Sequence, residues 1–287
     1  MSVRSSVDLN FFRKDIFMNN RAHRSTPSFS LAVYYTFAFI LFAGYIFVYQ
    51  TTPFEVAIND TLLNLIITFA SLFAAIVATV IFFHYHPEDR PRIVWLNLAL
   101  GCWFWFFAEA IWTAIYFVLG VVPTPSAADV GWVIGFIFFT IAIYHQYILI
   151  LPAWKNRIMI IAFGSWAFVL IVPWLVLSIM RIFTLEDCIN YFYPLADLGV
   201  GIAGLMLVYF FRGGLLMRPW LGMVVFGISD FFYAWAEQTG VYTWSVENNN
   251  LLTLAIDSSY LAAYLILGLG FLSHWILINY GLRGNQK

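Results

Sequence analysis

Acidic residues inside long apolar stretches are the part of this sequence most able to do chemistry. Glu109, Asp197, Asp230 and Asp257 lie within such stretches, and Asp129 stands at the start of another. A charged group inside a membrane-spanning segment is costly unless it faces protein or water, so it is a functional candidate by default. No Lys or Arg lies within these stretches to neutralise the acids. The pattern predicts a water-accessible cavity lined by carboxylates.

Four of these five acids are each followed, three residues later, by an aromatic residue, as Asp230 is followed by Tyr233. Residues three apart lie on the same face of a helix, so each carboxylate is expected beside an aromatic ring. A carboxylate supplies charge, and a ring supplies cation–π attraction and apolar cover, which suits a cationic or hydrogen-bonding ligand. Two alternatives stay open, namely hydrogen bonds between helices that serve packing alone, and conduction of ions or protons. The predicted ligand-binding residues are Glu109, Trp112, Asp129, Trp132, Asp197, Asp230, Tyr233, Asp257 and Tyr260.

The composition indicates what kind of chain positions these residues. Of the 287 residues, 62% are hydrophobic, 20% are aromatic and only 10% are charged, and the mean hydropathy is +0.84. Soluble globular domains are nearer to about half apolar and about a quarter charged. These values exclude a soluble enzyme, a nucleic-acid-binding protein and a disordered chain. The sequence therefore predicts an all-α polytopic membrane protein whose first partner is the lipid bilayer.

Eight apolar runs are each long enough to cross the roughly 30 Å hydrocarbon core of a bilayer. Within lipid each must be helical, because every backbone polar group needs an internal partner. Their approximate limits are 29–50, 61–84, 93–120, 130–151, 157–180, 188–211, 219–240 and 251–281. The chain then divides into a basic N-terminal segment at 1–28, an eight-helix transmembrane domain at 29–281 and a short tail at 282–287.

The Lys and Arg residues orient these spans. With eight spans, thirteen of the 14 basic residues fall in segments on one side of the membrane, and Arg181 falls on the other. By the positive-inside rule, both termini are expected to be cytoplasmic. The expected location is the inner or plasma membrane of the cell. The intramembrane acids then lie at mid-depth or in the outer half, so the cavity is expected to open to the outer side.

A weak internal repeat relates the two halves of the chain. The third and fourth spans each carry an acid–aromatic pair, with a glycine between the pairs, and so do the seventh and eighth. Two four-helix halves of the same orientation would be related by a pseudo-two-fold axis along the membrane normal. The aligned residues are Glu109, Gly120 and Asp129 in the first half and Asp230, Gly240 and Asp257 in the second.

Histidine, lysine and cysteine give no support for a cofactor. Four histidines near the inner ends of predicted spans fit the headgroup region better than a metal or haem site; they are His84, His86, His145 and His274. The three lysines all lie away from the span centres, which excludes a retinal Schiff base. Cys102 and Cys188 are expected to serve packing. No cofactor and no bound metal is predicted.

Two short motifs carry a resemblance to a known family. They are the run from Pro125 to Trp132, with Asp129 in it, and the run from Tyr193 to Asp197. The chain resembles the multi-span integral membrane sensory region found N-terminal to GGDEF and EAL domains in bacterial cyclic-di-GMP enzymes, over most of residues 30–280. The resemblance implies an inner-membrane sensing module with an unknown ligand. No cyclase or phosphodiesterase output domain is seen, so enzyme activity is not carried over.

These observations lead to one expected function and several alternatives. The chain is expected to be an integral membrane sensory or ligand-binding protein that takes a small ligand from the outer side. It is expected to signal to a separate cytoplasmic protein and to bind no nucleic acid. The main alternative is a transporter of a cation or cationic metabolite, which the repeat and the intramembrane acids also fit. A lipid-modifying enzyme is disfavoured because no catalytic constellation stands out, and a subunit of a larger complex is the remaining interpretation.

Overall fold

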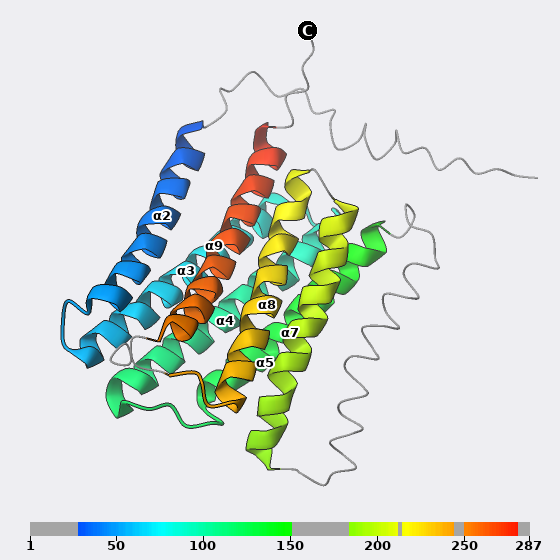
Figure 1. Ribbon diagram of the computed structural model, residues 1–287. Helices are drawn as coiled ribbons and strands as arrows, with labels where there is room; N and C mark the ends of the chain where they lie inside the picture. Colours follow the sequence, from blue (N-terminus) through cyan, green and yellow to red (C-terminus); the bar gives the residue numbers. More distant parts are fainter. Residues whose placement is uncertain (1–27, 151–183, 212–213, 244–249, 281–287) are drawn as a thin grey trace, which may run out of the picture.

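The computed structural model describes residues 28–150, 184–211, 214–243 and 250–280. These ranges hold seven long helices and a short 3-10 helix, and they contain no strand (Figure 1). The elements are α2 (Ser28–Thr51), α3 (Val56–His84), α4 (Arg92–Leu119), α5 (Ala127–Ile150), α7 (Leu185–Phe210), η2 (Leu215–Met217), α8 (Arg218–Gln238) and α9 (Leu251–Tyr280).

Each of these seven long helices is long and apolar enough to cross a membrane. The shortest has 21 residues and the longest 30, and at a rise of about 1.5 Å per residue each reaches across a hydrocarbon core. Seven of the predicted spans are therefore confirmed as helices. The predicted span at 157–180 lies outside the described residues, as do nearly all of the N-terminal segment and the tail at 282–287. The chain is a multi-pass helical membrane protein.

The helices form two layers of three, with α2 beside them (Figure 1). One layer contains α3, α4 and α5, and the other contains α9, α8 and α7. Helices that follow one another in the chain pack side by side within a layer, and the layers are joined where α3 meets α9 and α5 meets α7. α2 packs against both α3 and α9. The acid-bearing helices α4 and α5 therefore face α7, α8 and α9 across the interior.

Small residues let neighbouring helices approach closely. Gly201 and Gly227 meet where α7 crosses α8, and a Cβ atom added to Gly227 would lie 2.5 Å from the backbone oxygen of Asp197. In the other layer, a Cβ atom on Gly131 of α5 would lie 2.9 Å from the Cβ of Ala108 on α4. Lipid chains are as apolar as side chains, so close van der Waals packing is a main source of helix association in membranes. These crossings set the spacing between the acids on α4, α5, α7 and α8.

The ends of α4 and α8 have the same backbone conformation. Gly120 follows α4 with φ +69°, and Gly240 lies just after α8 with φ +71°. Both values fall in the left-handed region that favours glycine after a helix. At each of these glycines the chain turns away from the helix axis at the same end of the bundle.

The two ends of the bundle differ in charge. α3, α5, α7 and α9 begin at one end, where α2, α4 and α8 finish (Figure 1). Ten of the twelve acids in the described ranges lie at this end or between it and the middle of the bundle, whereas the three described arginines lie at the other end. Those arginines are Arg90, Arg92 and Arg218. The fold therefore collects negative charge around the first half of α3, α5, α7 and α9.

Candidate ligand-binding cavity

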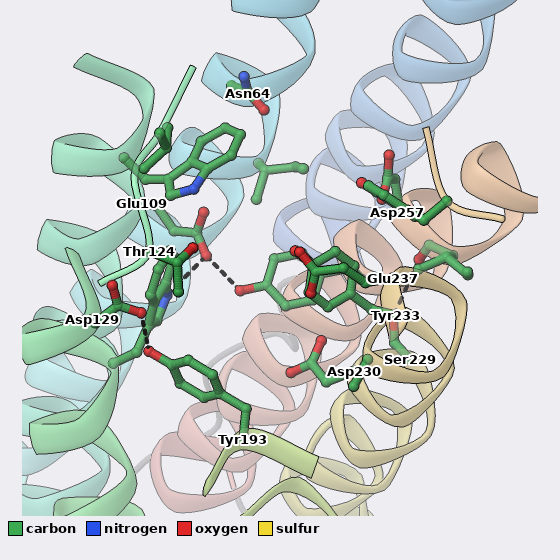
Figure 2. Close-up of a pocket in the computed structure, with 18 of the residues that line it drawn as sticks. Asn64, Glu109, Thr124, Asp129, Tyr193, Ser229, Asp230, Tyr233, Glu237 and Asp257 are labelled. Atoms are coloured by element: carbon green, nitrogen blue, oxygen red, sulfur yellow. Dashed lines mark hydrogen bonds between the residues drawn. The ribbon is translucent and has the colours of Figure 1, made fainter. Parts of the chain in front are cut away.

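A cavity of about 470 Å³ lies among the helices at the acidic end of the bundle (Figure 2). All seven long helices contribute to its wall, together with residues between α4 and α5. This volume falls within the range of about 300–1,000 Å³ that is typical of small-molecule sites.

Every ligand-binding residue predicted from the sequence lines this one cavity. Within the described part of the chain, no Lys, Arg or His lines it. Figure 2 shows carboxyl groups reaching the cavity from opposite walls, with Glu109 and Asp129 on one side and Asp230 and Asp257 on the other. The eight carboxyl groups in the wall belong to Asp60, Glu109, Asp129, Glu186, Asp197, Asp230, Glu237 and Asp257. The described wall is therefore strongly acidic, and none of its residues has a basic side chain that would balance the acids.

Glu109 connects three helices through one carboxyl oxygen. It lies on α4 and is 6% exposed. Its Oε1 atom accepts hydrogen bonds from the hydroxyl groups of Tyr260 and Tyr264 on α9, the latter at 2.9 Å. The Nε1 of Trp132 on α5 lies 3.4 Å from the same oxygen. These hydrogen bonds satisfy the buried carboxyl oxygen and hold α4, α5 and α9 together at the cavity wall.

Asp129 caps its own helix and also contacts α7. Its Oδ2 atom accepts hydrogen bonds from the backbone N–H of Ser126, at 2.5 Å, and from the Ser126 hydroxyl, at 3.1 Å. The Ser126 hydroxyl oxygen in turn accepts the backbone N–H of Ala128. The other carboxyl oxygen, Oδ1, accepts the hydroxyl of Tyr193 at 2.6 Å. Both oxygens of Asp129 therefore have protein donors, which fits a positioning role at the start of α5.

Two further carboxyl groups accept tyrosine hydroxyls on the α2–α3–α9 side of the cavity. Asp257 on α9 accepts the hydroxyl of Tyr242 at 2.8 Å, and the hydroxyl of Tyr45 on α2 also donates to it. Asp60 at the start of α3 accepts the hydroxyl of Tyr116 on α4 at 2.9 Å. A tyrosine hydroxyl donates a hydrogen bond without supplying a positive charge, so no basic group balances these acids in the described part of the cavity wall.

Asp197 on α7 and Asp230 on α8 differ from the acids above because their carboxyl groups meet each other. Their side chains meet directly at the α7–α8 crossing, and Glu109 lies near Asp230. Asp197 is 2% exposed, and its Oδ1 atom has no hydrogen-bond partner among the described residues. Two carboxylates this close repel each other, so the pair either shares a proton or is neutralised by a cation.

In three of the four acid–aromatic pairs predicted from the sequence, the aromatic residue contacts a group other than the acid three residues before it. Trp132, three residues after Asp129, donates to Glu109. Tyr260, three residues after Asp257, also donates to Glu109. Trp112 stacks on Tyr116 of its own helix, with ring centroids 5.5 Å apart. The hydrogen bonds from Trp132 and Tyr260 to Glu109 therefore run between helices, which spacing within one helix does not predict.

Several cavity residues were not predicted from the sequence. Asp60, Glu186 and Glu237 are the missed carboxyl groups, and Tyr45 and Tyr242 are the missed tyrosines that donate to Asp257. Asp60 and Glu186 lie just outside the predicted spans at 61–84 and 188–211, so a search for acids inside spans passes over them. Glu237 lies inside the predicted span at 219–240, close to its end, and was missed. The predicted topology could have identified these three acids, because it places all of them on the outer side of the membrane, where the cavity was expected to open.

A metal site is not supported in the described ranges, where no group of three His, Cys, Asp or Glu side chains converges closely enough to hold an ion. His274 lies at the opposite end of the bundle, where its Nε2 lies 2.9 Å from the Tyr85 hydroxyl and its ring packs on Trp95. Cys102 is buried in the core, as expected for a packing residue, and Cys188 is half-buried.

Comparison with known proteins gave no match to a family model, to a curated protein or to a solved structure. The class of this protein therefore follows from its own fold and site. It is a multi-pass helical membrane protein with an acidic and aromatic cavity toward one end of its helix bundle.

Proposed function

We propose that this chain is a membrane sensory or ligand-binding protein that takes a small cationic ligand into the acidic cavity from the outer side and signals to a separate partner. The observation that carries the proposal is the Asp197–Asp230 pair, in which Asp197 is buried and Asp230 is half-buried. The pair has no basic neighbour in the described cavity wall. A cation would neutralise the pair, and the surrounding rings would supply cation–π attraction. Binding changes signalling only if the ligand favours one conformation over another.

The proposed topology has eight spans with both termini in the cytoplasm. α5 and α7 run in the same direction (Figure 1), so an odd number of crossings between them is required, which a span at 157–180 would supply. The three described arginines lie at the end opposite the cavity, which by the positive-inside rule is the cytoplasmic end. The cavity then faces outward across an inner or plasma membrane.

The proposed repeat relates α4 and α5 to α8 and α9. Its two aligned glycines, Gly120 and Gly240, have nearly the same positive φ after α4 and α8. The contact of α3 with α9 would correspond to that of α7 with α5, as a two-fold arrangement of the halves requires. The resemblance to sensory regions that precede GGDEF and EAL domains supports the sensing role, since Asp129 and Asp197 of its motifs both line the cavity.

A transporter of a cation or cationic metabolite is the second candidate, favoured by the unbalanced acids within the bundle. The packing at the end of the cavity away from the acidic end of the bundle argues against a path across the membrane. Trp105 packs edge-to-face against Phe139 and Phe226, with ring centroids 4.9 Å apart in both cases. All three rings are 2% exposed or less and lie on the side of Glu109 away from the acidic end.

The proposal is tested by titrating the purified full-length chain, in lipid nanodiscs, with small ammonium compounds and their uncharged carbon isosteres. We expect a saturable response to cations that the isosteres do not give and that Asp230→Asn weakens at least tenfold. Glu88→Gln, an exposed acid at the opposite end, is the matched control and should bind normally. Equal responses to cations and isosteres would overturn the proposal.

The sensing and transport candidates are separated by a flux assay. Proteoliposomes that contain the chain are exposed to a cation that binds, and its uptake is followed. The sensor proposal expects binding without uptake. Uptake that Asp230→Asn abolishes and Glu88→Gln does not would favour the transporter. Native mass spectrometry of the protein extracted from its host in mild detergent would then identify a retained ligand or a cytoplasmic partner.

A further inference from the structure

The acids of the cavity fall into two separate centres. The first is the Asp197–Asp230 pair at the α7–α8 crossing, with Glu109 near Asp230. The second surrounds Tyr45 and Tyr49 of α2, which both lie near Asp257 and Asp60. The side chain of Tyr233 lies near both Asp230 and Asp257, so it connects the two centres along the wall. Figure 2 shows Asp230 and Asp257 at separate places in the same cavity.

The two centres differ in the hydrogen-bond donors that their carboxyl groups have. Asp257 and Asp60 each accept a tyrosine hydroxyl. Asp197 lines the cavity wall. Its Oδ1 atom is buried and has no hydrogen-bond partner in the described part of the chain. The absence of a convergent three-ligand group in the described ranges disfavours a compact metal ion. One ammonium group would neutralise one centre and leave the other unbalanced.

We infer that the ligand is a linear amine with two or more cationic groups, one bound at Asp197–Asp230 and another near Asp257; this inference rests on the proposed function. An alkyl chain between the two groups would lie against the ring of Tyr233, which lines the cavity and lies near both Asp230 and Asp257. The cavity of about 470 Å³ has room for such a chain. Separate carboxylate centres joined by aromatic surface favour a flexible dication over a single compact cation.

The test is a chain-length series on the full-length chain in lipid nanodiscs. Diaminobutane, diaminopentane, diaminohexane and diaminooctane are titrated beside the monoamines of the same length, by isothermal calorimetry. We expect at least one diamine to bind tenfold or more tightly than its monoamine, with an optimum at one length. Asp257→Asn and Asp230→Asn should each reduce the affinity for that diamine to that for the monoamine, whereas Glu88→Gln should not.

The outcomes distinguish this inference from the proposed function. Equal affinities for diamines and monoamines, both sensitive to Asp230→Asn, would overturn the dication inference and leave cation binding intact. A diamine preference that survives Asp257→Asn would also overturn it, because the second centre would then not hold a cationic group. No saturable binding of any amine would overturn both. The folding of each variant is compared with that of the wild-type chain by circular dichroism and gel filtration. If one of Asp230→Asn and Asp257→Asn misfolds, the other still tests whether its own centre holds a cationic group.

Discussion

The contact between α7 and α8 predicts a specific effect of adding one methyl group at Gly227. The added Cβ would lie 2.5 Å from the backbone oxygen of Asp197 and 2.9 Å from the Cα of Gly201. Ordinary van der Waals contact begins at 3.4 Å, so the two helices must separate by about 1 Å, the difference between 3.4 and 2.5 Å. Backbone atoms cannot rotate away as a flexible side chain can. Overpacking of this kind costs about 1–3 kcal/mol.

The same separation should impair the carboxyl pair. Asp197 supplies the oxygen that the new methyl group meets, and its side chain faces Asp230 across the crossing. A shift of about 1 Å in a binding constellation is enough to weaken a site, and we expect the affinity for cations to fall by about tenfold. Gly227→Ala is therefore expected to lower both the melting temperature and the affinity.

The assay is thermal unfolding in detergent together with calorimetric titration. The matched control is Gly44→Ala in α2, where an added Cβ atom would meet no atom within 4 Å. That control should melt at the same temperature as the parent chain or slightly above it, because Ala is the better helix former. If Gly227→Ala melts and binds as Gly44→Ala does, the close crossing of α7 and α8 is wrong, and with it the basis for the carboxyl pair.

Three further predictions follow from the hydrogen bonds and the backbone. Asp230→Asn should raise the melting temperature of the ligand-free chain while reducing cation affinity, because it removes the repulsion with Asp197; a lower melting temperature would contradict a strained pair. Tyr193→Phe removes the 2.6 Å donor to Asp129 and should cost about 1–2 kcal/mol in reversible unfolding; no change would show that this bond does not stabilise the α5–α7 contact. Gly120→Ala places a side chain at φ +69° and should cost about 1 kcal/mol in the same measurement, and a neutral result would argue against the left-handed turn.

The prediction of the spans succeeded because crossing a bilayer imposes a length and an apolar composition that are visible in one segment at a time. Seven predicted runs appear as helices, with ends close to the predicted limits. The placement of nine site residues in one cavity also follows from such local information, because acids inside spans must turn away from lipid and toward the interior of the bundle. Their binding of a ligand stays a prediction.

The partners of these acids depended on how the helices cross. Glu109 receives its donors from α5 and α9, and Asp129 receives one from α7. No spacing within one helix specifies such contacts, since they depend on crossing points that are set by small residues such as Gly227.

By itself, the sequence determined that this is a multi-pass helical membrane protein and that its buried acids face inward, because the hydrophobic thickness of a bilayer and the cost of charge in lipid act on each segment separately. Only the tertiary structure decided which acids accept tyrosine hydroxyls and which two, Asp197 and Asp230, meet each other. Hydrogen bonding and repulsion between carboxyl groups depend on distances between helices, and the packing of the whole bundle determines those distances.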